Sequence, residues 1–453
     1  MTNDLDGIVA RAMKTARETR RLEIGRGALA HAPMVWAQEF GSKPALIVAD
    51  PSTYAAAGQQ VSAAFRRAGL PVLDPFIYTE PELHAEHEHV VALEAALRAQ
   101  PEAIPVAVGT GTINDLTKLA AHRVGRRYLA LGTAASMDGY TAYGASITFN
   151  GAKQTFPCPA PAAVIADLDV IAAAPPDLNA AGYADLMAKS TAGADWLLSD
   201  ALGLEPINIG AWDLVQGPLR VALARPAGVP AGDLAALKPL TQGLMLGGLA
   251  MQWARTSHVA SGAEHLFSHL WDMQHHAHNG KTPWHGFKVA IGTLALTALY
   301  EYVLALPLDA FDPDRARPEW PAPDALDQRV CDLFPADDLR TVALTESRAK
   351  ALSRADWRDQ LAALGRLWPA LRAKLKAQLI PFTELKEMLR LAGAPVEPEQ
   401  IGISRPRLRQ SFWLASFLRR RFTVLDLAAR AGVLEPALDR LFAPGGRLAA
   451  PQP

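Results

Sequence analysis

The chain has 453 residues, of which 50% are hydrophobic and 20% are charged, and its formal net charge at pH 7 is −1. This length exceeds what one compact core usually serves, so the sequence predicts two domains. The composition is that of a globular protein, and the near-neutral charge argues against nucleic acid as a partner.

Cysteine content and the polarity of the amino terminus bear on location. The sequence contains two cysteines, Cys158 and Cys331, so it offers neither a disulfide framework nor a cysteine-based zinc site. The polar, acidic amino terminus predicts no signal peptide, and we expect a cytoplasmic protein. The most apolar window, residues 234–253, includes Lys238 and Pro239, which predicts a buried helix or helix pair rather than a membrane span.

The first third of the chain has the pattern of an α/β domain. Residues 1–42 are alanine-rich and predict helix, after which short apolar runs alternate with helical periods. Continuous apolar runs bounded by turn formers are typical of strands buried on both faces of a parallel sheet. The predicted strands are residues 44–50, 71–78, 105–108, 128–131 and 161–167, and the helices between them are residues 51–68, 83–100 and 114–122.

The remainder of the chain predicts helices only. Pro175 and Pro176 interrupt the pattern, and we place the domains at 1–170 and 171–453. Five prolines within residues 307–323 predict an exposed connector, and residues from about 324 to 453 predict a helical extension with a frayed end. The expected fold class is therefore α/β plus all-α.

A glycine-rich turn follows one predicted strand directly. Gly109-Thr-Gly111 precedes a predicted helix, and such glycines let backbone N–H groups approach a phosphate at the helix amino terminus. The third glycine of the dinucleotide fingerprint is replaced by Asn114, so a tight turn without a ligand is the alternative. Asp50, at the end of the first strand, either binds ribose hydroxyls, which would favour NAD over NADP, or caps the next helix.

Two further polar groups stand beside apolar segments. Residues 132–139 end the fourth strand with small and hydroxyl side chains, and such a loop can lie beneath a cofactor. Asp138 within it is either a turn residue or a contact for a substrate hydroxyl. Asp185 and Lys189 have the i, i+4 spacing of a surface ion pair, yet the segment around them is apolar, so the carboxylate needs a partner and a cation would serve.

Histidines are concentrated in one stretch, because seven of the 12 lie between His258 and His285. His265 and His269 are four residues apart, so a helix would present both on one face. His285 follows beside Gly286. Two or three imidazoles with a carboxylate form an ordinary metal site, and the alternative is a polar surface helix followed by a histidine-rich loop.

Together these motifs resemble the sn-glycerol-1-phosphate dehydrogenase family, which is related to glycerol dehydrogenase, iron-type alcohol dehydrogenases and dehydroquinate synthase. The motifs occur in the family's order, over roughly residues 44–295. The resemblance implies a Rossmann-like amino-terminal domain and an all-helical carboxy-terminal domain. The matching segments are Gly109–Asp115, Thr133–Gly139, Gly182–Asp185, Ser261–His269 and His285–Gly286.

The resemblance also implies the chemistry and the residues that carry it. The reaction is the reversible reduction of dihydroxyacetone phosphate to sn-glycerol-1-phosphate, with NAD, or NADP, as the cofactor. Asp185, His265 and His285 are implied to bind one divalent ion, zinc or nickel, while Asp138 and His269 contact the substrate. The implied cofactor residues are Asp50, Gly109, Gly111, Thr112, Ile113, Asn114, Asp115, Thr133, Ala134, Ala135, Ser136 and Ala142. Ala142 departs from the family pattern, because we expect a serine at this position in relatives.

Other activities remain open at this stage. A glycerol dehydrogenase acting on the unphosphorylated alcohol is the nearest alternative. A dehydroquinate-synthase-like lyase ranks lower, because its polyanionic substrate demands more basic residues than this sequence places near the motifs. A non-catalytic binding protein would leave metal ligands unused at a desolvation cost. We interpret the basic run Arg419–Arg421 as a solvated surface, and contact with a phosphate or an acidic neighbour is the alternative. We expect a homo-oligomer.

Overall fold

The computed structural model describes residues 4–149, 152–310, 323–335 and 337–450. Contacts divide the chain into two compact units, each drawn from several stretches of sequence. The first unit comprises residues 1–186, 209–259 and 391–394, and the second comprises residues 187–208, 260–390 and 395–453. The division of the chain at residue 170 into a cofactor domain and a metal domain stays a prediction.

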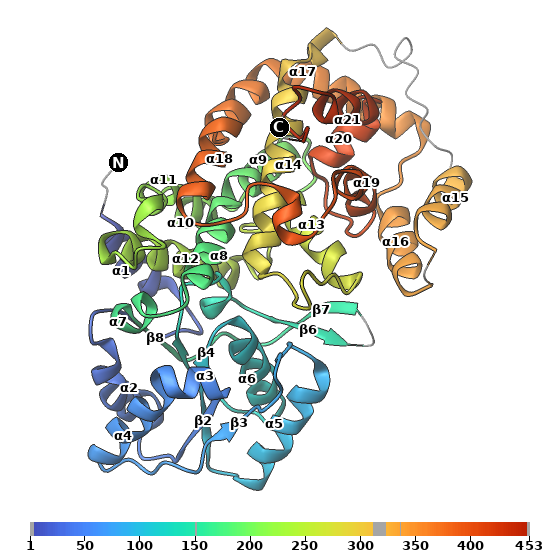
Figure 1. Ribbon diagram of the computed structural model, residues 1–453. Coiled ribbons are helices and arrows are strands. Elements are labelled where there is room, and N and C mark those ends of the chain that lie inside the picture. The colour runs from blue at the N-terminus through green and yellow to red at the C-terminus, as the bar shows by residue number, and fades with distance from the viewer. Residues whose placement is uncertain (1–3, 150–151, 311–322, 336, 451–453) are drawn as a thin grey trace. The chain divides into compact units, whose positions relative to one another are not determined.

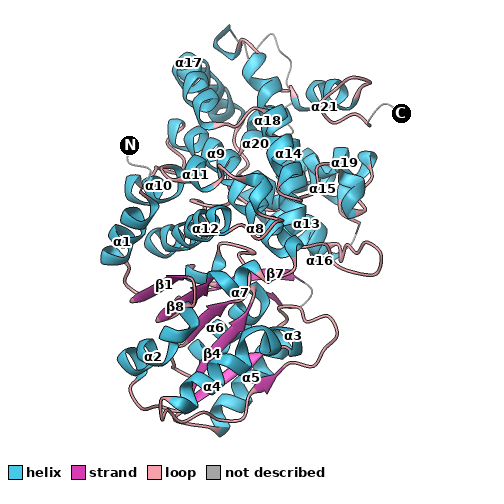
Figure 2. Ribbon diagram, turned by 60° about the vertical axis from the view of Figure 1, so that its left-hand side comes forward, coloured by secondary structure: helices cyan, strands magenta, loops and turns pink. Residues whose placement is uncertain are grey.

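The first unit is built around a six-stranded sheet with the order β1-β8-β5-β4-β2-β3, in which every neighbouring pair is parallel (Figure 2). A separate antiparallel hairpin is formed by β6 and β7. The strands are β1 (Arg21–Gly25), β2 (Ala45–Ala49), β3 (Phe76–Ile77), β4 (Ile104–Gly109), β5 (Leu129–Gly132), β6 (Ala145–Phe149), β7 (Ala152–Phe156) and β8 (Ala163–Asp167).

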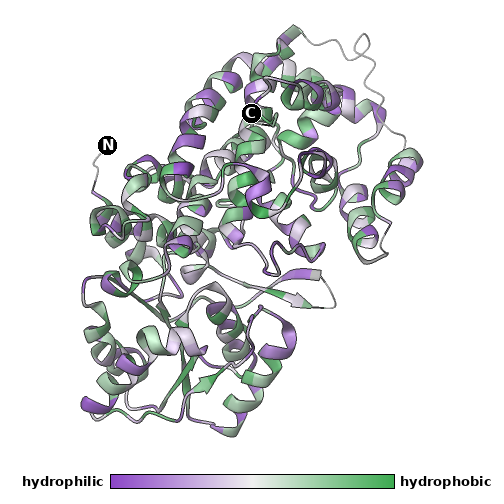
Figure 3. Cartoon of the chain, viewed as in Figure 1, coloured by the Kyte–Doolittle hydropathy of each residue, from purple (hydrophilic) through white to green (hydrophobic). Residues whose placement is uncertain are grey.

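Helices cover both faces of this sheet, with α2 (Ala32–Phe40) and α4 (Gln59–Arg67) on one side and α5 (His87–Ala99) and α6 (Gly111–Arg123) on the other (Figure 1). The central strands, β2, β4, β5 and β8, are buried along their whole length, and they are green in the hydropathy colouring of Figure 3. This double coverage explains why their sequences are continuous apolar runs rather than alternating ones.

The predicted strands at 44–50, 105–108, 128–131 and 161–167 are confirmed as β2, β4, β5 and β8. The prediction of helix throughout residues 1–42 is wrong, because Arg21–Gly25 forms the edge strand β1. This half-buried strand pairs only with β8, so it lacks the apolar run that marks a central strand. The hairpin of β6 and β7 was also not predicted.

The other helices of the first unit lie before, between and after the strands. The prediction of a buried helix over residues 234–253 is confirmed by α12, a single helix that contains Pro239. These helices are α1 (Leu5–Thr15), α3 (Pro51–Thr53), α7 (Leu168–Ala172), α8 (Pro176–Met187), α10 (Ile209–Gln216), α11 (Leu219–Ala222) and α12 (Leu234–Ala254).

The second unit forms helices and no strand in its described residues, as predicted. Helices α13 and α14 pack closely, and a Cβ on Gly292 of α14 would lie 2.5 Å from the Glu264 carbonyl oxygen of α13. The helices are α9 (Lys189–Ala201), α13 (Ala263–Met273), α14 (His285–Ala305), α15 (Pro323–Leu333), α16 (Asp337–Ala349), α17 (Arg354–Gln378), α18 (Phe382–Leu391), α19 (Arg405–Ser416), α20 (Val424–Arg430) and α21 (Leu434–Phe442).

Helix α14 is long and apolar enough to cross a membrane by length and composition, with a mean hydropathy of 1.4 over its most apolar window. However, 83% of that window is buried inside the structure, which is the situation of a core helix in a globular protein. Most of the proline-rich connector predicted at 307–323 lies outside the described residues.

Candidate active site

The strand order of the first unit brings three predicted cofactor segments to one edge of the sheet. Because all strands are parallel, the carboxyl ends of β2, β4 and β5 share an edge. Gly109 pairs with Gly132, and the Thr133 N–H donates to the Gly109 carbonyl over 3.1 Å. The chain runs from β2 outward to β3 and then returns to the other side of β2 for β4. Such a switch point is where open α/β sheets bind ligands.

Helix α6 begins two residues after β4. Its N-cap residue, Thr110, makes no side-chain cap hydrogen bond, so the first N–H groups of the helix lack that partner. A Cβ on Gly109 would lie 2.7 Å from the Ile113 side chain, and one on Gly111 would lie 3.2 Å from Met137. The two glycines therefore let the turn pack tightly between β4 and α6, with a helix amino terminus directed at the edge of the sheet.

Asn114 and Asp115 have side-chain partners inside the protein. The Tyr128 hydroxyl donates to Asn114 Oδ1 over 3.0 Å, and the Ser146 N–H donates to Asp115 Oδ2 over 3.0 Å. Lys118, whose side chain is fully buried, donates to the carbonyl of Gly144 over 2.9 Å. These contacts fix α6 to the β6–β7 hairpin. Both predicted cofactor residues thus have a structural role that the sequence did not indicate.

The loop after β5 is held by α8. Asn179 Oδ1 accepts a hydrogen bond from the Ala135 N–H over 2.9 Å, and a Cβ on Gly182 would lie 1.7 Å from the Ala135 carbonyl oxygen. Glycine at 182 is therefore required for α8 to lie against this loop. Two predicted cofactor residues of this region, Ala134 and Ala142, are also buried.

Asp50 caps a helix, which was one of its two predicted roles. Its Oδ1 accepts the Thr53 N–H over 2.8 Å, and the Thr53 hydroxyl accepts the Asp50 N–H over 3.0 Å. This reciprocal capping box fixes the turn at the end of β2. The predicted ribose contact of Asp50 stays a prediction.

Asp185 is buried on α8, with 1% exposure, and Lys189 at the start of α9 is completely buried. A surface ion pair between the two is therefore excluded. One carboxylate oxygen of Asp185 accepts the backbone N–H of Asp138 over 3.0 Å. The main chain of Asp138 thus helps to hold the Asp185 carboxylate in place. The predicted contact of the Asp138 side chain with substrate is a separate matter and stays a prediction.

The three predicted histidines converge within the second unit. His265 and His269 both lie on α13, with ring centroids 6.3 Å apart, and His285 is the first residue of α14. The His285 ring lies 5.3 Å from that of His265 and 6.5 Å from that of His269. The alternative of a solvated surface helix does not hold for His265, which is 6% exposed.

Neighbouring side chains orient two of these rings. His265 Nδ1 lies 2.8 Å from Glu264 Oε1, and His285 Nδ1 lies 3.1 Å from Ser268 Oγ. Because an ionised carboxylate can only accept, His265 Nδ1 carries the proton that it donates to Glu264, and Nε2 is then the ring nitrogen with the lone pair. Burial raises the pKa of Glu264, but the hydrogen bond and charge of His265 outweigh it, so this pKa lies below its usual value.

Asp185, His265 and His285 each offer one ligand atom, and these atoms lie within 4.8 Å of one another. One carboxylate oxygen and two imidazole nitrogens are donors that suit a divalent transition metal, and three protein ligands leave coordination positions open. This donor set fits a catalytic metal better than a structural one. The sequence analysis did not identify Glu264 or Ser268 as groups that orient the two rings. The position of Glu264 directly beside His265 could have indicated such a role.

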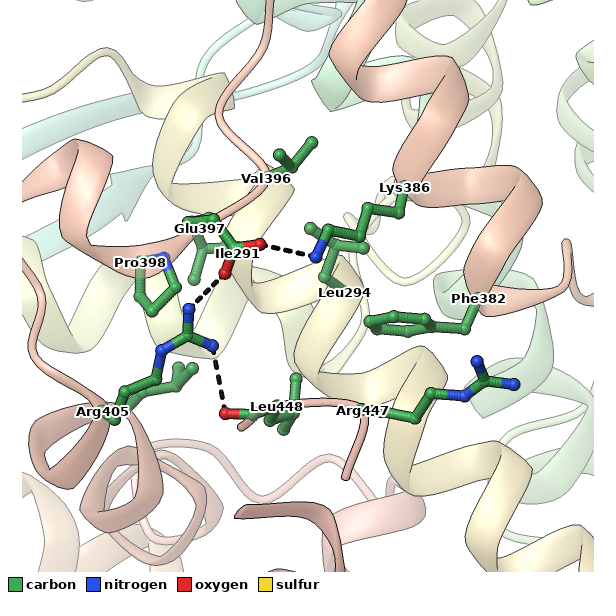
Figure 4. Close-up of a pocket in the computed structure, with 11 residues that line it drawn as sticks. Ile291, Leu294, Phe382, Lys386, Val396, Glu397, Pro398, Arg405, Arg447 and Leu448 are labelled. Carbon is green, nitrogen blue, oxygen red and sulfur yellow. Dashed lines mark hydrogen bonds and ion pairs between the residues drawn. The ribbon is translucent and has the colours of Figure 1, made fainter. Parts of the chain in front are cut away.

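A small pocket elsewhere in the second unit has a different character. Its volume is about 10 Å³, which is room for about one water molecule. Figure 4 shows Lys386 and Arg405 directed at Glu397, and the Lys386 ammonium lies 2.5 Å from that carboxylate. Arg447, which also lines the pocket, pairs with Glu301 instead. The charged groups of the pocket therefore all have ion-pair partners, and the pocket is a structural feature between α14, α18 and α19.

Comparison with known proteins agrees with this fold. The model of the iron-containing alcohol dehydrogenase family matches residues 23–175. A probable glycerol dehydrogenase from Sinorhizobium meliloti has a similar fold, with a TM-score of 0.59 and 16% identity, over 93% of this chain and 97% of that structure. The parallel sheet followed by a helical region is thus a fold of the type found in the iron-containing alcohol dehydrogenases, a class of oxidoreductases.

Sequence relatives narrow the assignment. A glycerol-1-phosphate dehydrogenase [NAD(P)+] from Halalkalibacterium halodurans is 36% identical over 285 residues, which are 63% of this chain and 71% of that protein. Another, from Geobacillus thermodenitrificans, is 28% identical over 392 residues, which are 84% of this chain and 86% of that protein. The chain belongs to the glycerol-1-phosphate dehydrogenase family.

Proposed function

We propose that this protein catalyses the reversible, NAD(P)-linked reduction of dihydroxyacetone phosphate to sn-glycerol-1-phosphate, with a divalent zinc or nickel ion held by Asp185, His265 and His285. The observation that carries the proposal is the proximity of the three ligand atoms, within 4.8 Å, in a member of this family. We further propose a cytoplasmic homo-oligomer.

The cofactor is assigned to the carboxyl edge of the parallel sheet. The N–H groups of Gly111, Thr112 and Ile113 open α6 beside Gly109 and suit a pyrophosphate. The loop of residues 133–136 supplies small side chains along which the cofactor can lie, with Ala142 in place of the expected serine. Asn114 and Asp115 act there through the turn that they stabilise, and the free side of the Asp50 carboxylate suits ribose hydroxyls.

The nicotinamide supplies the hydride, and the metal ion supplies Lewis acidity toward the substrate carbonyl. The protein side chains prepare for both. Glu264 accepts a hydrogen bond from His265 Nδ1, which directs the Nε2 lone pair of that ligand, and the Ser268 hydroxyl, 3.1 Å from His285 Nδ1, orients the second ring. We assign to His269, one turn after His265, a hydrogen bond to the substrate or the transfer of a proton, and to Asp138 a second substrate contact.

A glycerol dehydrogenase acting on unphosphorylated substrate is the second candidate, because the fold is shared with a probable glycerol dehydrogenase. The two are separated by adding NADH and either Zn²⁺ or Ni²⁺, then comparing NADH oxidation with dihydroxyacetone phosphate and with dihydroxyacetone. We expect turnover to favour the phosphorylated ketone. Faster turnover of dihydroxyacetone would refute the preference for a phosphorylated substrate. If neither ketone supports NADH oxidation, both candidates are refuted.

The ligand set has its own test. Asp185→Ala and His285→Ala should each lower turnover by at least about a hundredfold, because the charge that develops on the substrate oxygen would lose its stabilisation. Circular dichroism should show that both variants are folded. Full turnover of either variant after chelation would contradict the metal assignment.

A further inference from the structure

Asp195 is a buried carboxylate of α9 that has no part in the proposed chemistry. It is 2% exposed, and its two oxygens accept three hydrogen bonds. Oδ2 accepts the Ala263 N–H over 2.8 Å, whereas Oδ1 accepts the Tyr300 hydroxyl over 2.5 Å and the Val424 N–H over 2.9 Å. The donors lie on α13, α14 and α20, so one side chain joins four helices of the second unit.

The bond to Ala263 has a direct consequence for the metal-binding helix. Ala263 is the first residue of α13, and its N-cap residue, Gly262, has no side chain that could cap the helix. Asp195 performs this capping from another helix, because its Oδ2 accepts the first N–H group of α13. His265 follows Ala263 by two residues, so the capped turn is the turn that carries the proposed metal ligand.

The same turn is held at a second point by α9. Thr191, one helical turn before Asp195, donates its hydroxyl to Glu264 Oε2 over 2.9 Å. A Cβ on Gly262 would lie 2.7 Å from Asp195 Oδ2 and 2.8 Å from Glu264 Oε2. The two carboxylates therefore flank Gly262 without spare room. A shift of Asp195 would move the turn and with it Glu264, which orients the His265 ring.

We propose that Asp195 is a positioning residue, which fixes the first turn of α13 and so sets the geometry with which His265 binds the metal. The proposal rests on the proposed function through the assignment of His265 as a ligand. It also gives the carboxy-terminal region a role. Val424 begins α20, and Arg421 donates a hydrogen bond to the Ser261 carbonyl just before α13. The interpretation of the whole run Arg419–Arg421 as solvated is thus wrong for Arg421, which is only partly exposed.

The test uses Asp195→Asn in the full-length protein. The amide has one acceptor oxygen, so either the Ala263 N–H or the donors on α14 and α20 face an NH₂ group. We expect the affinity for Zn²⁺ or Ni²⁺, measured by competition with a chromophoric chelator, to fall about tenfold, as for other groups that orient a ligand histidine. The matched control is Ser199→Ala, because Ser199 is equally buried on α9 and its hydroxyl has no hydrogen-bond partner among the described residues.

A second variant keeps the test decisive if Asp195→Asn does not fold. Tyr300→Phe removes one donor to Asp195 and keeps the ring, so it should lower metal affinity by a smaller factor while the urea unfolding midpoint stays near that of Ser199→Ala. Metal affinity at the wild-type level in the folded variants would overturn the positioning role. A wild-type protein that binds neither ion would instead refute the ligand set, so the two failures are distinguishable.

Discussion

The replacement Glu264→Gln isolates the contribution of one buried charge to the proposed metal site. Oε1 of Glu264 accepts the Gly262 N–H over 2.6 Å and lies 2.8 Å from His265 Nδ1, while Oε2 accepts the Thr191 hydroxyl. A glutamine can keep its oxygen at the Oε1 position. Its NH₂ group can then donate to the Thr191 oxygen, because that hydroxyl can donate instead to the Ala188 carbonyl, 3.0 Å away. The variant should therefore fold with the same packing.

The loss falls on the bond to His265. A carboxylate acceptor raises the basicity of a ligand imidazole and fixes its tautomer, and outer groups of this kind contribute about ten- to hundredfold to metal affinity. This corresponds to about 1.4–2.7 kcal/mol of binding free energy. Because the pKa of Glu264 lies below its usual value, the ionised carboxylate stabilises the folded state, so we also expect the urea unfolding midpoint of the metal-free protein to fall.

The assay is a competition titration with Zn²⁺ or Ni²⁺ against a chelator, with unfolding in urea measured in parallel. The control is Glu301→Gln on α14, whose carboxylate accepts the Phe382 N–H over 2.8 Å and pairs with Arg447, away from the three histidines. The control should keep wild-type metal affinity. If Glu264→Gln is folded and binds metal as tightly as the control, the reasoning about the His265 tautomer is refuted.

Three further predictions concern other parts of the structure. Asp50→Gly should narrow the preference for NADH over NADPH, because it removes a carboxylate that would repel a 2′-phosphate; unchanged kcat/KM ratios would argue against the ribose contact. Gly182→Ala should destabilise the protein by about 1–3 kcal/mol and weaken NADH binding, because its Cβ would meet the Ala135 carbonyl at 1.7 Å; calorimetry and fluorescence titration check both effects. Burial and the charge of Glu264 raise the pKa of Asp195 from 3.8 to about 7. Between these two pKa values the folded state therefore binds more protons than the unfolded state, so the free energy of unfolding should fall as pH rises from about 4 to about 7. The Asp195→Asn variant should show a smaller fall. Equal pH slopes of the urea unfolding midpoint in both proteins would contradict this.

The local patterns of the sequence were sufficient for much of the fold, and the set of metal ligands, which stays a prediction, followed from the resemblance to a family. Central strands such as β4 are buried on both faces, so their apolar runs are visible without any knowledge of their neighbours. His265 and His269 are related by the period of one helix, and the glycines around Gly111 mark a tight turn. These features depend on residues a few positions apart, and the motif order then indicated the family.

Tertiary structure alone decided which distant groups meet. The sheet order places the ends of β2, β4 and β5 at one edge, and no local pattern encodes that order. The edge strand β1 and the buried Lys118 depend on partners that sequence periodicity does not reveal. Asp195 accepts a hydrogen bond from Val424, which is 229 residues further along the chain. In the sequence, nothing distinguishes Asp195 from an ordinary aspartate of an alanine-rich helix. It needs hydrogen-bond donors because the folded chain buries it away from water.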